Sequence, residues 1–184
     1  DRERVLRVEH RRQELDGQVH RALDMADDEP AAIQVVGRTL AEVVPGRPAE
    51  LLLADSSKAH LIQAVVAGPD PVGPGCDVES PFACTAVRNG HTMEFETSSA
   101  LDACPKLRDR ATGACSAVCV PVTFMGRAIG VLHAVGPDGE TPDVEEVTGL
   151  EMLSTQAGAR IGMLRSMSRT QLQATTDGLT GLPN

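Results

Sequence analysis

Aromatic residues are nearly absent from the sequence: it has no tryptophan, no tyrosine and three phenylalanines among its 184 residues. A core built on large rings is therefore excluded. Hydrophobic residues still make up 41% of the chain, which is enough for a core of leucine, valine, isoleucine, alanine and methionine. The length fits one domain with helical extensions.

Long apolar runs are also missing. No run reaches the roughly 18 residues that a membrane-spanning helix needs, and the first residues have no signal-peptide pattern. We therefore expect a cytoplasmic location and no membrane contact by this fragment. The chain begins at Asp1 rather than at methionine, which indicates a piece excised from a longer protein.

Positive charge is the minority sign: 17 lysines and arginines face 26 acidic residues, giving a net charge of −9 and a pI near 5.0. An acidic surface repels phosphate backbones, so no nucleic-acid partner is expected. Basic residues do gather near the start of the chain, but glutamates are interleaved with them, as on a solvated helix face. These basic residues are Arg2, Arg4, Arg7, Arg11 and Arg12.

The five cysteines have no metal-binding spacing such as Cys-x-x-Cys. Without a secretory signal, reduced thiols are the expectation. Cys115 and Cys119 fall on one face of an expected strand, about 13 Å apart, which is too far to share an ion. They read as small core residues. The sequence therefore predicts no metal site and requires no cofactor.

Residues 1–29 have the spacing of a long helix with one apolar seam. The steps of three and four residues are those of a heptad repeat, interrupted by Arg12. This pattern favours a coiled-coil dimer, although an amphipathic helix lying on its own domain would show it too. The seam includes Val5, Val8, Leu15 and Val19.

The rest of the chain alternates between helix and strand patterns. A second helix begins at Pro30 and ends before Pro45-Gly46. Period-two segments, loops and short helical stretches follow, and a last helix is expected over 143–174, with an apolar stripe that includes Leu153, Ile161 and Leu164. The expected strands are 50–54, 60–67, 91–96, 114–123 and 127–135, with a short helix at 82–88 and long loops at 68–81 and 97–113.

The stretch Cys119-Val-Pro-Val-Thr-Phe-Met-Gly126-Arg-Ala-Ile129-Gly-Val-Leu132 resembles a motif of GAF domains. The helix–glycine–strand step at Ala86–Gly90 and the order of elements are similar as well. The resemblance implies an α+β fold with an antiparallel sheet flanked by helices. It also implies that the first and last helices form a parallel homodimer, with Val5, Val8, Leu15, Val19, Leu153, Ile161 and Leu164 as the dimer-helix candidates.

The last eight residues, Asp177-Gly-Leu179-Thr180-Gly-Leu-Pro-Asn184, resemble the opening of a GGDEF domain, the family that makes cyclic di-GMP from GTP. This resemblance implies a junction at Asp177, Leu179, Thr180 and Asn184, followed by a diguanylate cyclase domain. The chain then divides into a signalling helix (1–29), a GAF domain (30–158), a linker helix (159–175) and the truncated start of the GGDEF domain (176–184). No catalytic residue falls within it.

The GAF resemblance also implies a small-molecule pocket on the sheet face away from the long helices, roofed by the two long loops. Its candidate residues are Cys76, Cys104, Arg108, His91 and His133. Bilin attachment is not expected, since no cysteine neighbours a histidine. The predicted function is regulation of a cyclase by an unidentified small ligand or by redox state. A structural dimerisation unit and a reductase of GAF fold, using paired thiols, are the alternatives.

Overall fold

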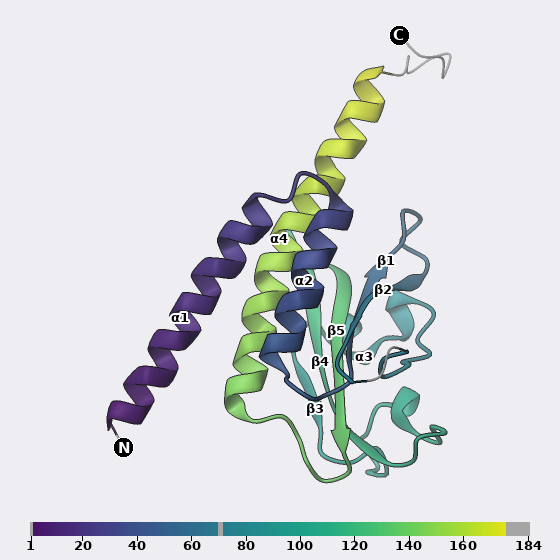
Figure 1. Ribbon diagram of the computed structural model, residues 1–184. Helices are drawn as coiled ribbons and strands as arrows, with labels where there is room; N and C mark the ends of the chain where they lie inside the picture. The colour runs from purple at the N-terminus through teal and green to yellow at the C-terminus, as the bar shows by residue number, and fades with distance from the viewer. Residues whose placement is uncertain (1, 70–71, 176–184) are drawn as a thin grey trace.

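The computed structural model describes residues 2–69 and 72–175 and contains one five-stranded antiparallel sheet (Figure 1). The strand order is β2-β1-β5-β4-β3. The strands are β1 (Ala49–Ala54), β2 (Leu61–Ala67), β3 (Met93–Phe95), β4 (Cys115–Phe124) and β5 (Arg127–Pro137). The α+β class expected from the sequence is confirmed.

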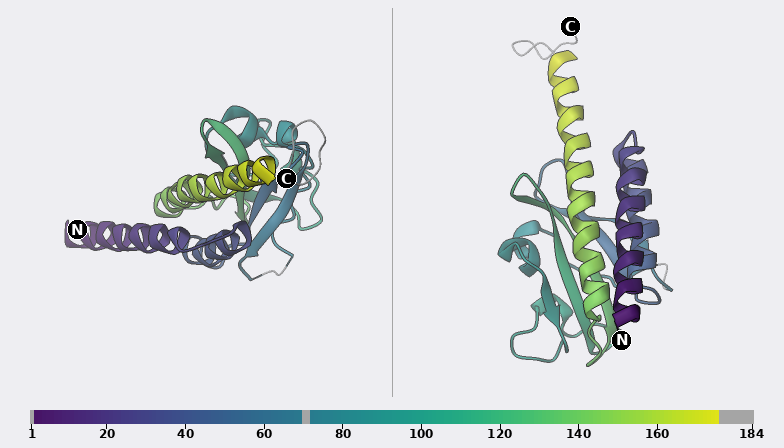
Figure 2. Two further views of the ribbon diagram at one scale, coloured as in Figure 1. Left: turned by 90° about the horizontal axis from the view of Figure 1, so that it is seen from above. Right: turned by 90° about the vertical axis from the view of Figure 1, so that its left-hand side faces the viewer.

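Two long helices lie on one face of the sheet, and a third packs against them from outside (Figures 1 and 2). They are α1 (Arg2–Asp24), α2 (Glu29–Val43) and α4 (Val144–Thr175). The α2 helix begins where Asp28 accepts a hydrogen bond from the Ala31 backbone N–H. The α4 helix begins with a reciprocal capping box, in which Asp143 and Glu146 each accept a hydrogen bond from the other's backbone N–H.

The opposite face is covered by short elements and loops. These are the 3₁₀ turn η1 (Pro81–Ala83), the helix α3 (Thr85–Asn89) and the 3₁₀ turn η2 (Pro105–Leu107). The α3 helix ends at Gly90, whose φ of 71° is the left-handed conformation that glycine adopts at low cost. The helix expected over 82–88 is thus split in two, and the strand expected over 91–96 is shortened to three residues.

The long helices bury their apolar faces within their own chain. The exposed fraction is 3% for Val19, 0% for Leu153 and Ile161, and 8% for Leu164, and Leu15 packs half-buried against the same core. These five side chains were assigned to a dimer seam from the sequence. The structure instead gives them to the core, because α4 lies on the sheet and α1 packs against α4 and α2. Val8 is exposed, and the side chain of Val5 is outside the described part of the chain.

One strand residue also differs from its expected orientation. A break in the β4–β5 register between Val122 and Thr123 leaves Ile129 as an extra residue in β5. Ile129 therefore packs with the helix-side core, whereas strict alternation placed it on the face of Val131 and His133. The expected junction residues Asp177, Leu179, Thr180 and Asn184 lie outside the described residues. Over residues 2–69 and 72–175, no helix has both the length and the apolar character needed to cross a membrane.

The contribution of α4 packing can be measured at Leu153. Leu153→Ala should lower the free energy of unfolding by about 2–5 kcal/mol, because it opens a cavity in the core. The control Val144→Ala lies on the same helix at 83% exposure and should change it by less than about 0.5 kcal/mol. Urea unfolding followed by far-UV circular dichroism suits a chain without tryptophan. Equal losses in the two variants would contradict this packing.

Candidate functional site

Four of the five cysteines and His133 surround one small cavity on the sheet face away from the long helices. We call this the thiol cavity. Its sulfur-bearing lining residues are Cys76, Cys84, Cys104 and Cys119. The cavity volume is about 20 Å³, which leaves room for roughly one water molecule. Organic ligand sites usually measure 300 Å³ or more, so a metabolite would have to displace the roof.

The cysteines come from four separate segments. Cys119 lies on β4, directly opposite His133 of β5, so both side chains point to the same face of the sheet. Cys84 and Cys104 immediately precede α3 and η2, and the Thr85 hydroxyl donates to the Cys104 sulfur at 3.5 Å. Cys76 belongs to the loop after β2. Its position depends on tertiary contacts rather than on a local turn.

A buried carboxylate holds Cys76 in place. Glu50 of β1 is fully buried and lies opposite His133 across the β1–β5 pair. Its carboxylate accepts hydrogen bonds from the backbone N–H of Cys76 at 3.0 Å and from the side-chain amide of Gln63. Burial raises the pKa of Glu50, although these two hydrogen bonds and Arg110 act in the opposite direction. Glu50 therefore anchors the loop over the cavity.

Arg110 joins the two roof loops to His133. Its guanidinium donates to the carbonyl oxygens of Pro74 at 3.1 Å and Lys106 at 2.9 Å, and it lies 3.4 Å from His133 Nε2. Since a guanidinium can only donate, Nε2 must be the acceptor. The proton of the neutral imidazole is then on Nδ1, which lies 3.2 Å from the sulfur of Cys119. The ring is thus fixed as one tautomer.

Burial keeps His133 and three of the cavity thiols uncharged. It lowers the pKa of His133 to about 3, with Arg110 adding to the effect. It raises the pKa of Cys76 to about 11, that of Cys84 above its ordinary value and that of Cys119 well above it. These three thiols are protonated at neutral pH, which makes them poor nucleophiles.

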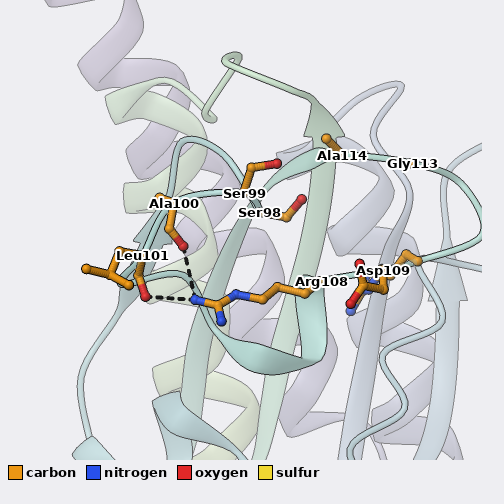
Figure 3. A pocket seen from close by; sticks show the side chains of 9 residues that line it. Ser98, Ser99, Ala100, Leu101, Arg108, Asp109, Gly113 and Ala114 are labelled. Carbon is orange, nitrogen blue, oxygen red and sulfur yellow. Dashed lines mark hydrogen bonds between the residues drawn. The ribbon is translucent and has the colours of Figure 1, made fainter.

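Two of the five residues predicted as pocket candidates lie elsewhere. His91 is exposed beyond α3, where its Nδ1 meets the Asn89 carbonyl. Arg108 lines a separate surface hollow of about 690 Å³ and donates to the carbonyls of Ala100 and Leu101 (Figure 3). Its hydrogen bonds hold the backbone of the hollow itself. Cys76, Cys104 and His133 do meet in the thiol cavity.

Four residues of the site were not among the predicted candidates. Neither Cys84 nor Cys119 has a ligand-like spacing to another cysteine, and the sequence predicts a core position for Cys119. Glu50 and Arg110 were missed as supports of the cavity. An available signal was Glu50 itself, a lone carboxylate that begins an otherwise apolar strand. Among the described residues, no three histidine, cysteine or acidic side chains are arranged to hold a metal ion.

The neutral state of His133 predicts a pH dependence. The folded chain resists protonation of this ring down to about pH 3, whereas the unfolded chain binds the proton near pH 6.5. Stability from this group is therefore full above pH 6.5 and falls as the pH drops toward 3. His133→Gln should reduce the loss between pH 7 and pH 5 by about 2 kcal/mol. Urea unfolding at both pH values would measure it.

The exposed His91→Gln variant is the matched control for that experiment. It should lose as much stability between the two pH values as the parent chain. A loss in His133→Gln equal to that of the parent would show that the buried ring is not the group responsible.

Comparisons with known proteins agree with the fold. A family model described as GAF domain matches residues 14–161. The GAF domain of an Acinetobacter phosphoenolpyruvate-protein phosphotransferase is 13% identical, with a TM-score of 0.68 over 84% of this chain and 94% of that one. A free methionine-R-sulfoxide reductase from Neisseria meningitidis, solved with its substrate, is 22% identical, with a TM-score of 0.61 over 85% and 91%.

A GAF domain/HD domain protein from Geobacter sulfurreducens is 17% identical, with a TM-score of 0.60 over 78% of this chain and 98% of that one. No curated protein matches the chain significantly. At these identities the solved structures show the fold alone, but the family model spans most of the sequence. Sheet order, helix placement and family model therefore agree that this chain belongs to the GAF domain family.

Proposed function

We propose that this GAF domain is the regulatory part of a diguanylate cyclase and that the thiol cavity receives the signal. The supporting observation is that the cavity and α4 lie on opposite faces of the same two strands. Cys119 and His133 face the cavity, while Val118, Val120 and Leu132 of β4 and β5 pack in the core beneath α4. A shift of the β4–β5 hairpin would therefore move both the wall of the thiol cavity and the surface on which α4 packs.

A direct contact ties this hairpin to α4. The hydroxyl of Ser154, in the middle of α4, donates to the carbonyl of Pro121 on β4 at 2.7 Å, and both groups are buried. Gly158 lies against the backbone of Thr123, where any Cβ would come within 2.1 Å of the Thr123 oxygen. The helix therefore cannot slide along β4 freely. A ligand can shift α4 only if it binds the two positions of the hairpin with different affinity.

The chemistry of the cavity favours a small ligand over redox sensing. Neutral thiols and one imidazole suit a small ligand with affinity for sulfur and nitrogen. Thiol oxidation is the second candidate, because neighbouring cysteines could form a disulfide and give two electrons and two protons to a peroxide, which becomes water. The raised pKa values place it second, since the attacking species is the thiolate.

Two features support an output through α4. The helix has 32 residues, so it is about 48 Å long, and Leu164 is the last buried one among those whose side chains the structure describes. The helix then continues beyond the domain toward the octapeptide 177–184, which resembles the start of a GGDEF domain (Figure 1). Cyclase chemistry needs two such domains face to face. The geometry of two paired α4 helices would therefore control it, and we call the C-terminal part of α4 the stalk.

We further propose that the stalk forms a parallel homodimer through the exposed part of α4. Met163 and Met167 lie one turn apart on that helix, with exposures of 47% and 54%. They take the place of the buried seam residues that the sequence suggested. A chain that dimerises without any ligand in its cavity would be the purely structural alternative.

The signal site can be tested in the full-length protein. Native mass spectrometry of protein purified from its own cells should show a bound mass, which Cys84→Ser and Cys119→Ser each remove. The same variants should change the rate of cyclic di-GMP formation from GTP about fivefold or more. Cys115→Ser is the control, since Cys115 packs in a neighbouring cluster outside the cavity.

The outcomes separate the parts of the proposal. Absence of cyclic di-GMP formation by the full-length protein would exclude the cyclase. Cyclase activity with no bound mass, unchanged in the cavity variants, would leave the structural alternative. A mass loss of two hydrogens after peroxide treatment, blocked by Cys84→Ser or Cys119→Ser, would favour redox sensing over ligand binding.

The dimer has its own test. Met163→Glu with Met167→Glu should weaken self-association at least tenfold, or about 1.4 kcal/mol, in light scattering or sedimentation equilibrium over a concentration series. Met125→Glu is the control, because Met125 is 87% exposed on the β4–β5 turn. A parent chain that stays monomeric at high concentration would exclude the dimer.

A further inference from the structure

A second cavity lies where α4 leaves the sheet. It is bounded by the β1–β2 turn, η1, α3, the β4–β5 turn and the second half of α4, and its volume is about 800 Å³. We call it the stalk cleft. It is separate from the thiol cavity and shares no lining residue with it. Its volume lies within the 300–1,000 Å³ of sites for small organic ligands.

The cleft has the opposite charge to the chain as a whole. Its lining holds five basic side chains and one acidic side chain, Asp55, in a protein of net charge −9. Asp55 is already engaged in its own turn, where it accepts from the Ser57 hydroxyl and from the backbone N–H of Ala59 and His60. Its oxygens therefore compete little for the basic residues. These are Lys58, Arg88, Arg127, Arg165 and Arg169.

Most of these cations lack a partner in residues 2–69 and 72–175. Among the described residues, the side chains of Lys58, Arg88, Arg127 and Arg169 make no hydrogen bond or ion pair. Arg165 is different, since Glu29 holds its guanidinium at 2.6 Å and the Ala54 carbonyl accepts from it at 2.8 Å. One arginine is thus fixed in place, and the others are free to meet an anion.

The cleft also has an apolar part with two of the three phenylalanines of the chain. Phe124 lies against α4 at Gly162, where an added Cβ would come within 2.1 Å of the ring. The glycine therefore allows the ring to lie close to the helix. Phe82, on η1, also lines the cleft and is 77% exposed. An exposed ring in a chain so poor in aromatics offers a surface for stacking.

We propose that the stalk cleft binds an organic phosphate of nucleotide size, with its phosphates on the arginines and its planar ring against the phenylalanines. Guanidinium groups match phosphate oxygens in pairs, and aromatic rings stack on nucleobases with little regard to their identity. The bound molecule bridges α4 to the β4–β5 hairpin, because Arg169 comes from the helix and Arg127 from the start of β5. It therefore favours one position of the stalk.

Isothermal titration of the chain with ATP and GTP tests this proposal, with pyrophosphate and adenosine as partial probes. We expect the nucleotides to bind more tightly than either partial probe, because each partial probe reaches only half of the cleft. Arg127→Gln and Arg169→Gln should each weaken nucleotide binding about tenfold. Arg38→Gln, an exposed change on α2 outside the cleft, should leave it unchanged.

Four results would overturn the proposal: no binding at millimolar nucleotide, binding by pyrophosphate as tight as by nucleotide, unchanged binding in both cleft variants, or an equal loss in Arg38→Gln. Melting temperatures close to that of the parent would show that the cleft variants are folded. The proposal does not depend on the thiol cavity. Nucleotide binding that persists in Cys84→Ser would show that the two sites are distinct.

Discussion

The β4–β5 hairpin is buried on both faces, and the other features of the domain depend on this constraint. On one face Val118, Val120, Val122 and Leu132 have exposures of 0–3% beneath the helices. On the other, Cys119 and His133 form the floor of the thiol cavity. Close-packed interiors transmit displacement because they have little free volume to absorb it. A displacement of the cavity wall is therefore transmitted to α4.

The polar groups around the cavity form one connected network rather than separate contacts. Glu50 holds the loop at Cys76, and Arg110 holds both roof loops and fixes the tautomer of His133. Unpaired polar groups at this depth would be costly, so each member constrains the next. The network explains why such a small cavity has so many defined donors. Its rigidity also explains why a metabolite cannot enter without moving a roof loop.

The sequence predicted the helices and strands better than it predicted what packs against their apolar faces. Alternation along 114–123 and 127–135 and the stripe of α4 placed the hairpin and the last helix within a few residues, since these patterns depend only on which side is buried. The same periodicity cannot say what covers an apolar face. Val19 and Ile161 fit a coiled coil and a domain core equally well, and they pack in the core.

The meeting of four cysteines at one cavity was harder still to predict from the sequence. The four cavity cysteines occupy positions 76, 84, 104 and 119, and no spacing among them signals a common site. Cys76 and Cys104 are predictable as pocket residues because they lie in long loops that can roof a cavity. The positions of Cys84 and Cys119 at the cavity follow only from the folded structure. The extra residue at Ile129 reversed one orientation because alternation assumes an unbroken register.

The stalk cleft and the thiol cavity suit ligands of different chemistry, but both sites act on α4. Arg165 links the end of β1 at Ala54 to Glu29 at the start of α2, so the part of α4 above the core is attached to both layers of the fold. Beyond Leu164 the helix has no buried apolar side chain within the described residues. The free energy that orients the stalk must therefore come from this short segment. That segment lines the cleft. A small number of charge-assisted contacts to a bound phosphate can therefore shift the orientation of α4 by as much free energy as a movement of the β4–β5 hairpin does.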